Sequence, residues 1–138
     1  MGTADHSVVT FRVFGDALVP SEVTARLACE PTVAFAKGDV RIGSKTGNHY
    51  VEKTGRWSLS AEDRRPEDIS AQIEEILGKL SSDPLVWEYM KSNYSMDLFC
   101  GVFMGSANDG LEFGAELLGL IADRGIRLAL DVYAPDDD

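Results

Sequence analysis

Histidine and cysteine are scarce in this chain, which has two of each among 138 residues. A structural zinc site needs about four clustered cysteine, histidine or carboxylate ligands. His6 and His49 lie far apart in the sequence, so we expect no metal site. Cys29 and Cys100 form no Cys-x-x-Cys pair, and we expect both to be buried, reduced thiols.

Long apolar runs and an excess of positive charge are also lacking. No run approaches the roughly 20 apolar residues that span a bilayer, and the N-terminus lacks the pattern of a signal peptide. We therefore expect a cytoplasmic protein that does not bind membranes. Thirteen Lys and Arg against 23 Asp and Glu give a formal net charge of −10, so we expect no nucleic-acid partner.

The composition that remains is that of an ordinary globular protein, with 44% hydrophobic and 26% charged residues. A length of 138 residues is close to the commonest domain size. We predict a single domain over residues 1–138, in which 1–6 form a flexible leader and 134–138 an acidic tail.

Four segments alternate apolar and polar residues as strands do. They are residues 7–14, 56–60, 96–104 and 126–133. Helices are predicted to start near residues 20, 66, 84 and 109. The last start rests on Asp109 and Glu112, whose spacing is typical of a capping box.

The predicted order β-α-β-α-β-α-β indicates an α+β fold with a ferredoxin-like sandwich. Its sheet would be four-stranded and mainly antiparallel, with the first and third strands in the centre. An inserted helical segment would join the two βαβ halves. A doubly wound parallel sheet is the alternative, although four short strands are few for it.

The two faces of this predicted sheet differ in chemistry. We expect helices to cover one face, which carries Phe11, Val13, Leu98, Leu128 and Leu130. The opposite face then carries arginines and aromatics. These are Arg12, Phe14, Phe99, Phe103, Arg127 and Tyr133. Single-stranded RNA readers use such a surface for stacking, but the net acidity favours two other interpretations. Either the segment with Trp87 and Tyr89 covers this face, or a second copy does, which would make a homodimer through the sheet face.

Residues 32–55 form the least regular segment and carry a local excess of positive charge. A loop of this length is often functional. We predict a ligand-binding site at Lys37, Arg41, Arg56 and Trp57, because arginine binds carboxylates and phosphates in two-point geometry and tryptophan offers a stacking surface. The competing interpretation makes Trp57 a core anchor and pairs Arg56 with an acid on a neighbouring strand.

Sequence motifs of catalysis are missing. The chain has neither a Gly-x-Ser-x-Gly elbow nor a Gly-rich phosphate loop with its lysine. Asp16, Asp39 and Asp63 are candidate general bases, but their spacing brings no two of them together. We therefore assign no catalytic residue and no cofactor, and expect a protein other than an enzyme.

Six segments of the chain are distinctive when taken together: Phe11–Asp16, Val19–Val23, Pro31–Thr32, Lys37–Asp39, Gly55–Leu59 and Gly125–Tyr133. This set resembles a bacterial family known only as domain of unknown function 4279. The resemblance implies one self-contained bacterial domain and places Gly55 and Trp57 within a motif. It implies no activity and no catalytic residue.

Three hypotheses of function follow. The first is a binding or interaction module that neutralises a basic protein partner, by analogy with immunity proteins that bind toxins. The second is a regulatory domain that binds a small anionic metabolite near Lys37, Arg41 and Arg56. The third is an enzyme that depends on carboxylates such as Asp16 and Asp39.

Overall fold

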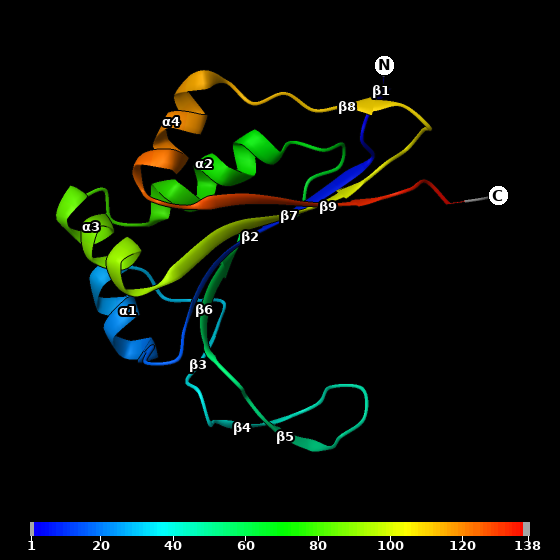
Figure 1. The fold of residues 1–138 in the computed structure, drawn as a ribbon. Coiled ribbons are helices and arrows are strands. Elements are labelled where there is room, and N and C mark those ends of the chain that lie inside the picture. The colour runs from blue at the N-terminus through cyan, green and yellow to red at the C-terminus, as the bar shows by residue number, and fades with distance from the viewer. Residues whose placement is uncertain (1, 137–138) are drawn as a thin grey trace.

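The computed structural model describes residues 2–136, and its largest element is a five-stranded sheet (Figure 1). In spatial order the strands are β3 (Val33–Phe35), β6 (Gly55–Ser60), β2 (His6–Gly15), β7 (Ser95–Phe103) and β9 (Arg127–Tyr133). All neighbours are antiparallel except β7 and β9, which are parallel. The fold is therefore α+β, with a mixed sheet.

Within residues 2–136, two small strand pairs form separate two-stranded sheets. β1 (Gly2–Thr3) pairs with β8 (Asp109–Gly110), and β4 (Val40–Ile42) forms a hairpin with β5 (His49–Val51). The expected leader, residues 1–6, thus contains a strand, and its Ala4 is fully buried. Met1 and residues 137–138, the end of the expected acidic tail, lie outside the described residues.

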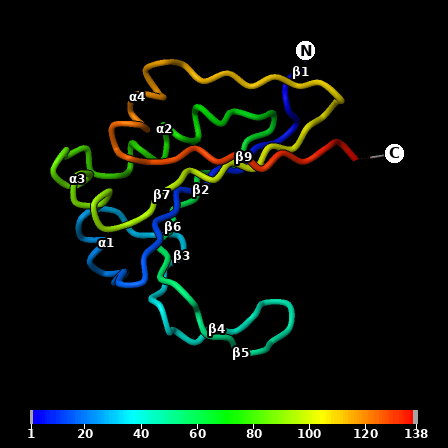
Figure 2. The backbone as a smooth tube through the Cα atoms, viewed as in Figure 1, coloured from blue at the N-terminus to red at the C-terminus, as the bar shows by residue number. Residues whose placement is uncertain are grey.

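Four helices lie on one side of the sheet (Figures 1 and 2). They are α1 (Pro20–Leu27), α2 (Ile69–Lys79), α3 (Pro84–Asn93) and α4 (Ala115–Asp123). Proline occupies the first turn of α1 and α3, where its missing N–H has no helical partner to lose. The carboxylate of Asp68 caps α2 by accepting a hydrogen bond from the backbone N–H of Ala71.

The predicted capping box at Asp109 is wrong. Asp109 lies in β8, and its carboxylate accepts hydrogen bonds from the backbone N–H groups of Gly105 and Ser106. It thereby closes the turn between β7 and β8. Helix α4 starts later, after Gly114, and has no side-chain cap.

The predicted sheet needs two corrections. It has five strands and not four, because β3 lies inside the segment that we expected to be irregular. The ferredoxin-like arrangement is not confirmed, since a split βαβ unit would place another strand between β7 and β9. These two strands are instead direct neighbours, and β2 pairs directly with β6. As predicted, β2 and β7 have neighbours on both sides.

The core fills the space between the sheet and the helices. Phe11 contacts Trp57 and Trp87 in edge-to-face geometry, with ring centroids 6.1 and 6.0 Å apart. Trp87 comes from α3, so the inserted segment packs on the helix side and does not cover the opposite face. Val13 and Leu98 are fully buried there too. Leu130 on β9, which we also expected under the helices, is 44% exposed.

Gly55 is required where β6 starts against β2. A Cβ atom at this position would lie 2.7 Å from the backbone oxygen of Gly15 and 3.0 Å from the Cβ of Leu18. Backbone at such a distance cannot move aside without shifting the strand. The Gly-Arg-Trp motif therefore begins with glycine because two chain segments approach closely here.

We expect Gly55→Ala to lower the free energy of unfolding by about 1–3 kcal/mol, as overpacking does in a closely packed site. The matched control is Gly78→Ala in α2, where an added Cβ meets nothing within 4 Å. It should leave stability unchanged or raise it by up to about 1 kcal/mol, since alanine favours helix. Urea unfolding of both variants makes the comparison, and equal effects would contradict the steric explanation.

Candidate functional site

The face of the sheet that points away from the helices, here called the open face, combines arginine with aromatic side chains. The register pairs Arg12 with Asp97, Thr10 with Phe99, and Phe14 with Arg56. Because side chains directly opposite each other in a sheet point to the same face, these residues share one surface. This face carries the predicted residues Arg12, Phe14, Phe99, Phe103, Arg127 and Tyr133.

An ion pair joins β2 and β7 on the open face, in the half of β2 that is closer to Gly15. Nε and one terminal nitrogen of Arg12 donate to the two oxygens of Asp97, at 2.9 and 2.7 Å. The guanidinium also lies 4.3 Å from the ring centroid of Phe99 and 5.0 Å from that of Phe14. The hydrogen bond to Asp97 raises the pKa of Arg12. Asp97 therefore already binds the guanidinium of Arg12 in two-point geometry, and we interpret this pair as a structural contact between β2 and β7.

A ladder of stacked rings lies at the opposite end of β2. His6 stacks on Phe103 and Phe103 on Tyr133, with centroids 4.8 and 4.7 Å apart. The Tyr133 hydroxyl donates to Asp131 on the same strand, which raises the pKa of the phenol. His6 lies 3.3 Å from a carboxylate oxygen of Asp63. The ladder ties β2, β7 and β9 together.

Phe35 on β3 forms a third cluster with two of the predicted site residues. The guanidinium of Arg41 lies 4.5 Å from the Phe35 ring centroid, and that of Arg56 lies 5.3 Å from it. Arg41 also contacts Glu52 at 3.4 Å. Within residues 2–136, Arg56 makes no ion pair, and its Nε is buried without a hydrogen-bond partner. The structure thus brings Arg41 and Arg56 together on the open face.

The other two predicted site residues lie elsewhere. Trp57 is fully buried on the helix side, and its indole N–H donates to the hydroxyl of Thr24 at 3.0 Å. Neighbouring residues of a strand point to opposite faces, so Trp57 cannot share a surface with Arg56. Lys37 lies in the turn after β3, with its ammonium 3.5 Å from Asp16.

The two cysteines and the candidate general bases Asp16 and Asp39 show no sign of a catalytic arrangement within the described residues. Cys100 is fully buried, and burial together with the charge of Asp97 raises the pKa of its thiol to about 12. Cys29 is half-buried, contrary to our expectation. Asp39 accepts a hydrogen bond from the backbone N–H of Ala36 at 2.8 Å, and Asp16 faces Lys37.

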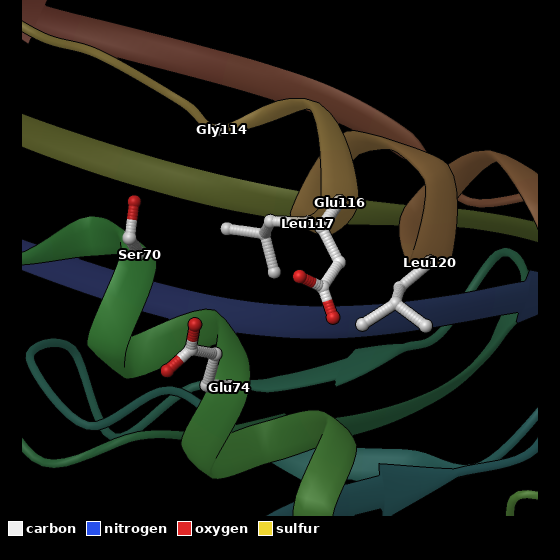
Figure 3. Close-up of a pocket in the computed structure, with 6 residues that line it drawn as sticks. All are labelled: Ser70, Glu74, Gly114, Glu116, Leu117 and Leu120. Atoms are coloured by element: carbon white, nitrogen blue, oxygen red, sulfur yellow. The ribbon is translucent and has the colours of Figure 1, made fainter.

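An acidic pocket of about 290 Å³ lies between α2 and α4, on the helix side. Glu74 and Ser70 from α2 line it together with Glu116 and Leu117 from α4, and the two carboxylates are visible in it in Figure 3. Neither glutamate forms an ion pair within the described part of the chain. The sequence alone does not indicate this pocket, because the pocket depends on α2 and α4 being neighbours.

Sequence reasoning also missed Phe35 and Asp97. Phe35 belongs to a strand of three residues, too short for alternation to be recognised. Asp97 follows Met96 in a strand of mostly apolar residues, and its arginine partner lies 85 positions away. A charged residue inside an apolar strand was the available signal, since a buried charge needs a partner.

These features define the class of protein: an α+β domain with a one-sided helix layer and an open sheet face rich in arginine and aromatic rings. The chain belongs to the family described as Domain of unknown function (DUF4279), whose model matches residues 5–135. No curated protein and no solved structure matches it. Within residues 2–136, none of the helices is long and apolar enough to cross a membrane.

We expect Arg12→Met to lower the free energy of unfolding by about 2–4 kcal/mol, because it leaves the Asp97 carboxylate buried without its partner. The double variant Arg12→Met with Asp97→Leu removes both charges and should be more stable than Arg12→Met alone. Urea unfolding of the wild type and both variants tests this. A double variant less stable than Arg12→Met would contradict the role of Asp97 as a charge that needs pairing.

Proposed function

We propose that this protein is a binding module that holds the anionic group of a small metabolite, a carboxylate or phosphate, at Phe35 on the open face. The observation that carries the proposal is the pair Arg41 and Arg56, which share one aromatic ring, while Arg56 has no acidic partner within residues 2–136. Both guanidinium groups lie within 5.3 Å of the same ring centroid, so their positive charges repel each other, and the proposed anion would reduce this repulsion.

The local charge supports this proposal. Residues 32–56 carry five Lys and Arg against two Asp and Glu, a net +3, which leaves −13 for the rest of the chain. An anion therefore meets an attractive field at this end of the molecule and a repulsive field elsewhere. Because the rest of the chain is acidic, the positive charge of residues 32–56 distinguishes this part of the surface from the remainder.

The four residues predicted from the sequence have different parts in the proposed site. Arg41 and Arg56 supply forked donors that fit carboxylate and phosphate oxygens. Lys37 is exposed, and its pairing with Asp16 at 3.5 Å is weak enough to be exchanged for an anion. Trp57 has an indirect part, because its buried indole anchors β6 and thereby positions Arg56.

The test is thermal unfolding in sodium phosphate and in sodium citrate, each compared with sodium chloride at equal ionic strength. A bound anion raises the midpoint according to RT ln(1 + [L]/Kd). We expect a gain for the wild type and its loss in Arg41→Gln with Arg56→Gln. The control, Lys79→Gln with Lys91→Gln, removes the same charge from the helix side and should keep the gain.

Two results would count against the proposed anion site. One is a midpoint that depends on ionic strength alone, without a difference between the anions. The other is a gain that survives in the Arg41 and Arg56 double variant, which would place the bound anion elsewhere on the chain.

A second candidate function is binding of a basic protein, favoured by the acidic pocket between α2 and α4. Glu74 and Glu116 line the same pocket, and neither forms an ion pair with the residues that the structure describes, so a lysine or arginine side chain of a partner would fit it chemically. The net charge of −13 outside residues 32–56 would speed association with a basic partner. This candidate keeps the hypothesis of a neutralised basic protein and assigns it a surface.

We expect a fluorescent oligolysine peptide to bind this surface with an association rate that falls as ionic strength rises. Glu74→Gln with Glu116→Gln should weaken binding several-fold. Glu22→Gln with Glu30→Gln, which removes the same charge from the neighbourhood of α1, is the control. Equal weakening by the two pairs would mean that only net charge matters, and an association rate independent of salt would exclude the hypothesis.

A further inference from the structure

The outer edge of β9 is the long unpaired edge of the five-stranded sheet. Within residues 2–136, β9 has seven residues and pairs with β7 on one side only, whereas the other edge strand, β3, has three residues. An edge strand presents unpaired N–H and C=O groups that can pair with another strand. Proteins usually protect such edges with short strands or charged side chains. β3 is protected because it has only three residues.

The side chains around this edge are unusually apolar for an exposed strand. Leu130, Val132 and Tyr133 are 44%, 54% and 45% exposed. Leu118 on α4 is also exposed, at 43%. Leu118 and Leu120 lie about 200° apart around the helix. Since Leu120 faces α2 and α3 in the two pockets that it lines, Leu118 points to the opposite flank, toward the β9 edge.

The sequence of β9 is complementary to itself in antiparallel pairing. Arg127-Leu128-Ala129-Leu130-Asp131 carries a cation at one end, an acid at the other and matched leucines between. The register with β7 places Arg127, Ala129 and Asp131 on the open face. A two-fold axis at Ala129 therefore sets Arg127 of each copy opposite Asp131 of the other, and Leu128 opposite Leu130.

We propose that β9 pairs with β9 of a second copy of this chain, antiparallel about a two-fold axis at Ala129. The two sheets then form one continuous sheet with two Arg127–Asp131 pairs across the seam on the open face. The axis is perpendicular to the sheet, so the helices of both copies stay on the same side. There Leu118 of each copy lies beside the seam and is covered by the other.

Charge selects this register over its neighbours. An axis at Leu130 would place Asp131 opposite Ala129 and leave both charges of each copy without an opposite charge across the seam. An axis at Asp131 would place two acids opposite each other, which is destabilising. Only the axis at Ala129 pairs both charged residues of the strand and faces leucine with leucine.

The test uses sedimentation equilibrium of the full chain over a wide range of concentration. The wild type should be a dimer, and Arg127→Asp and Asp131→Arg should each weaken it roughly tenfold or more, because each places like charges opposite each other twice. Mixing the Arg127→Asp chain with the Asp131→Arg chain restores both opposite-charge pairs. We therefore expect the mixture to form a heterodimer more stable than either homodimer.

The mixing result can only arise between chains. Residues 127 and 131 are four positions apart on one strand, about 13 Å at 3.3 Å per residue, too far for a direct pair within one copy. Leu118→Glu should also weaken the dimer, while Leu85→Glu, at an exposed leucine of α3, is the matched control. Urea unfolding of each variant confirms that the monomer remains folded.

Three results would overturn the proposal. A wild type that stays monomeric at every concentration would leave the β9 edge to a strand of another protein. A dimer that both charge reversals leave intact would use a different surface, such as the open face. A mixture of the two variants without a heterodimer would exclude the axis at Ala129.

Discussion

The alternation of side chains along β2 is the constraint on which the rest of the structure depends. β2 is the middle strand of the five-stranded sheet. Because neighbouring residues of a strand point to opposite faces, its odd-numbered residues from Ser7 to Val13 enter the core under the helices and its even-numbered residues lie on the open face. A shift of one residue would exchange Phe11 with Arg12 and bury an arginine among aromatic rings. The close contact of Gly55 with Gly15 fixes β6 against β2, and the Arg12–Asp97 pair fixes β7.

The same alternation explains how much of the fold could be predicted. Strands of six or more residues with a regular pattern were predicted close to their observed bounds, and six residues of the open face were predicted as well. β3 could not be found, since three residues contain little periodicity. The order of the strands was also out of reach, because β6 pairs with β2 and β9 with β7 through contacts between distant segments.

The candidate site shows a different limit. Arg56 and Trp57 are adjacent in the sequence and were combined into one predicted site, although adjacent residues of a strand face opposite ways. The structure assigns Trp57 to the core and Arg56 to the open face beside Phe35. Arg41 lies beside Arg56 and Phe35 because the segment after β3 turns back over the open face. Nothing in the local pattern of residues 36–41 indicates such a path.

Electrostatics connects the proposed anion site with the proposed seam. β3 and β9 are the two edges of the sheet, so a dimer through β9 places the two Phe35 clusters at opposite ends of the continuous sheet. Each cluster, with Arg41 and Arg56, then lies farther from its copy than the Debye length of about 8 Å at physiological ionic strength. Dimerisation therefore adds no repulsion between the cationic sites. The seam itself carries one cation and one acid per copy, and so joins two acidic chains where their charges are balanced.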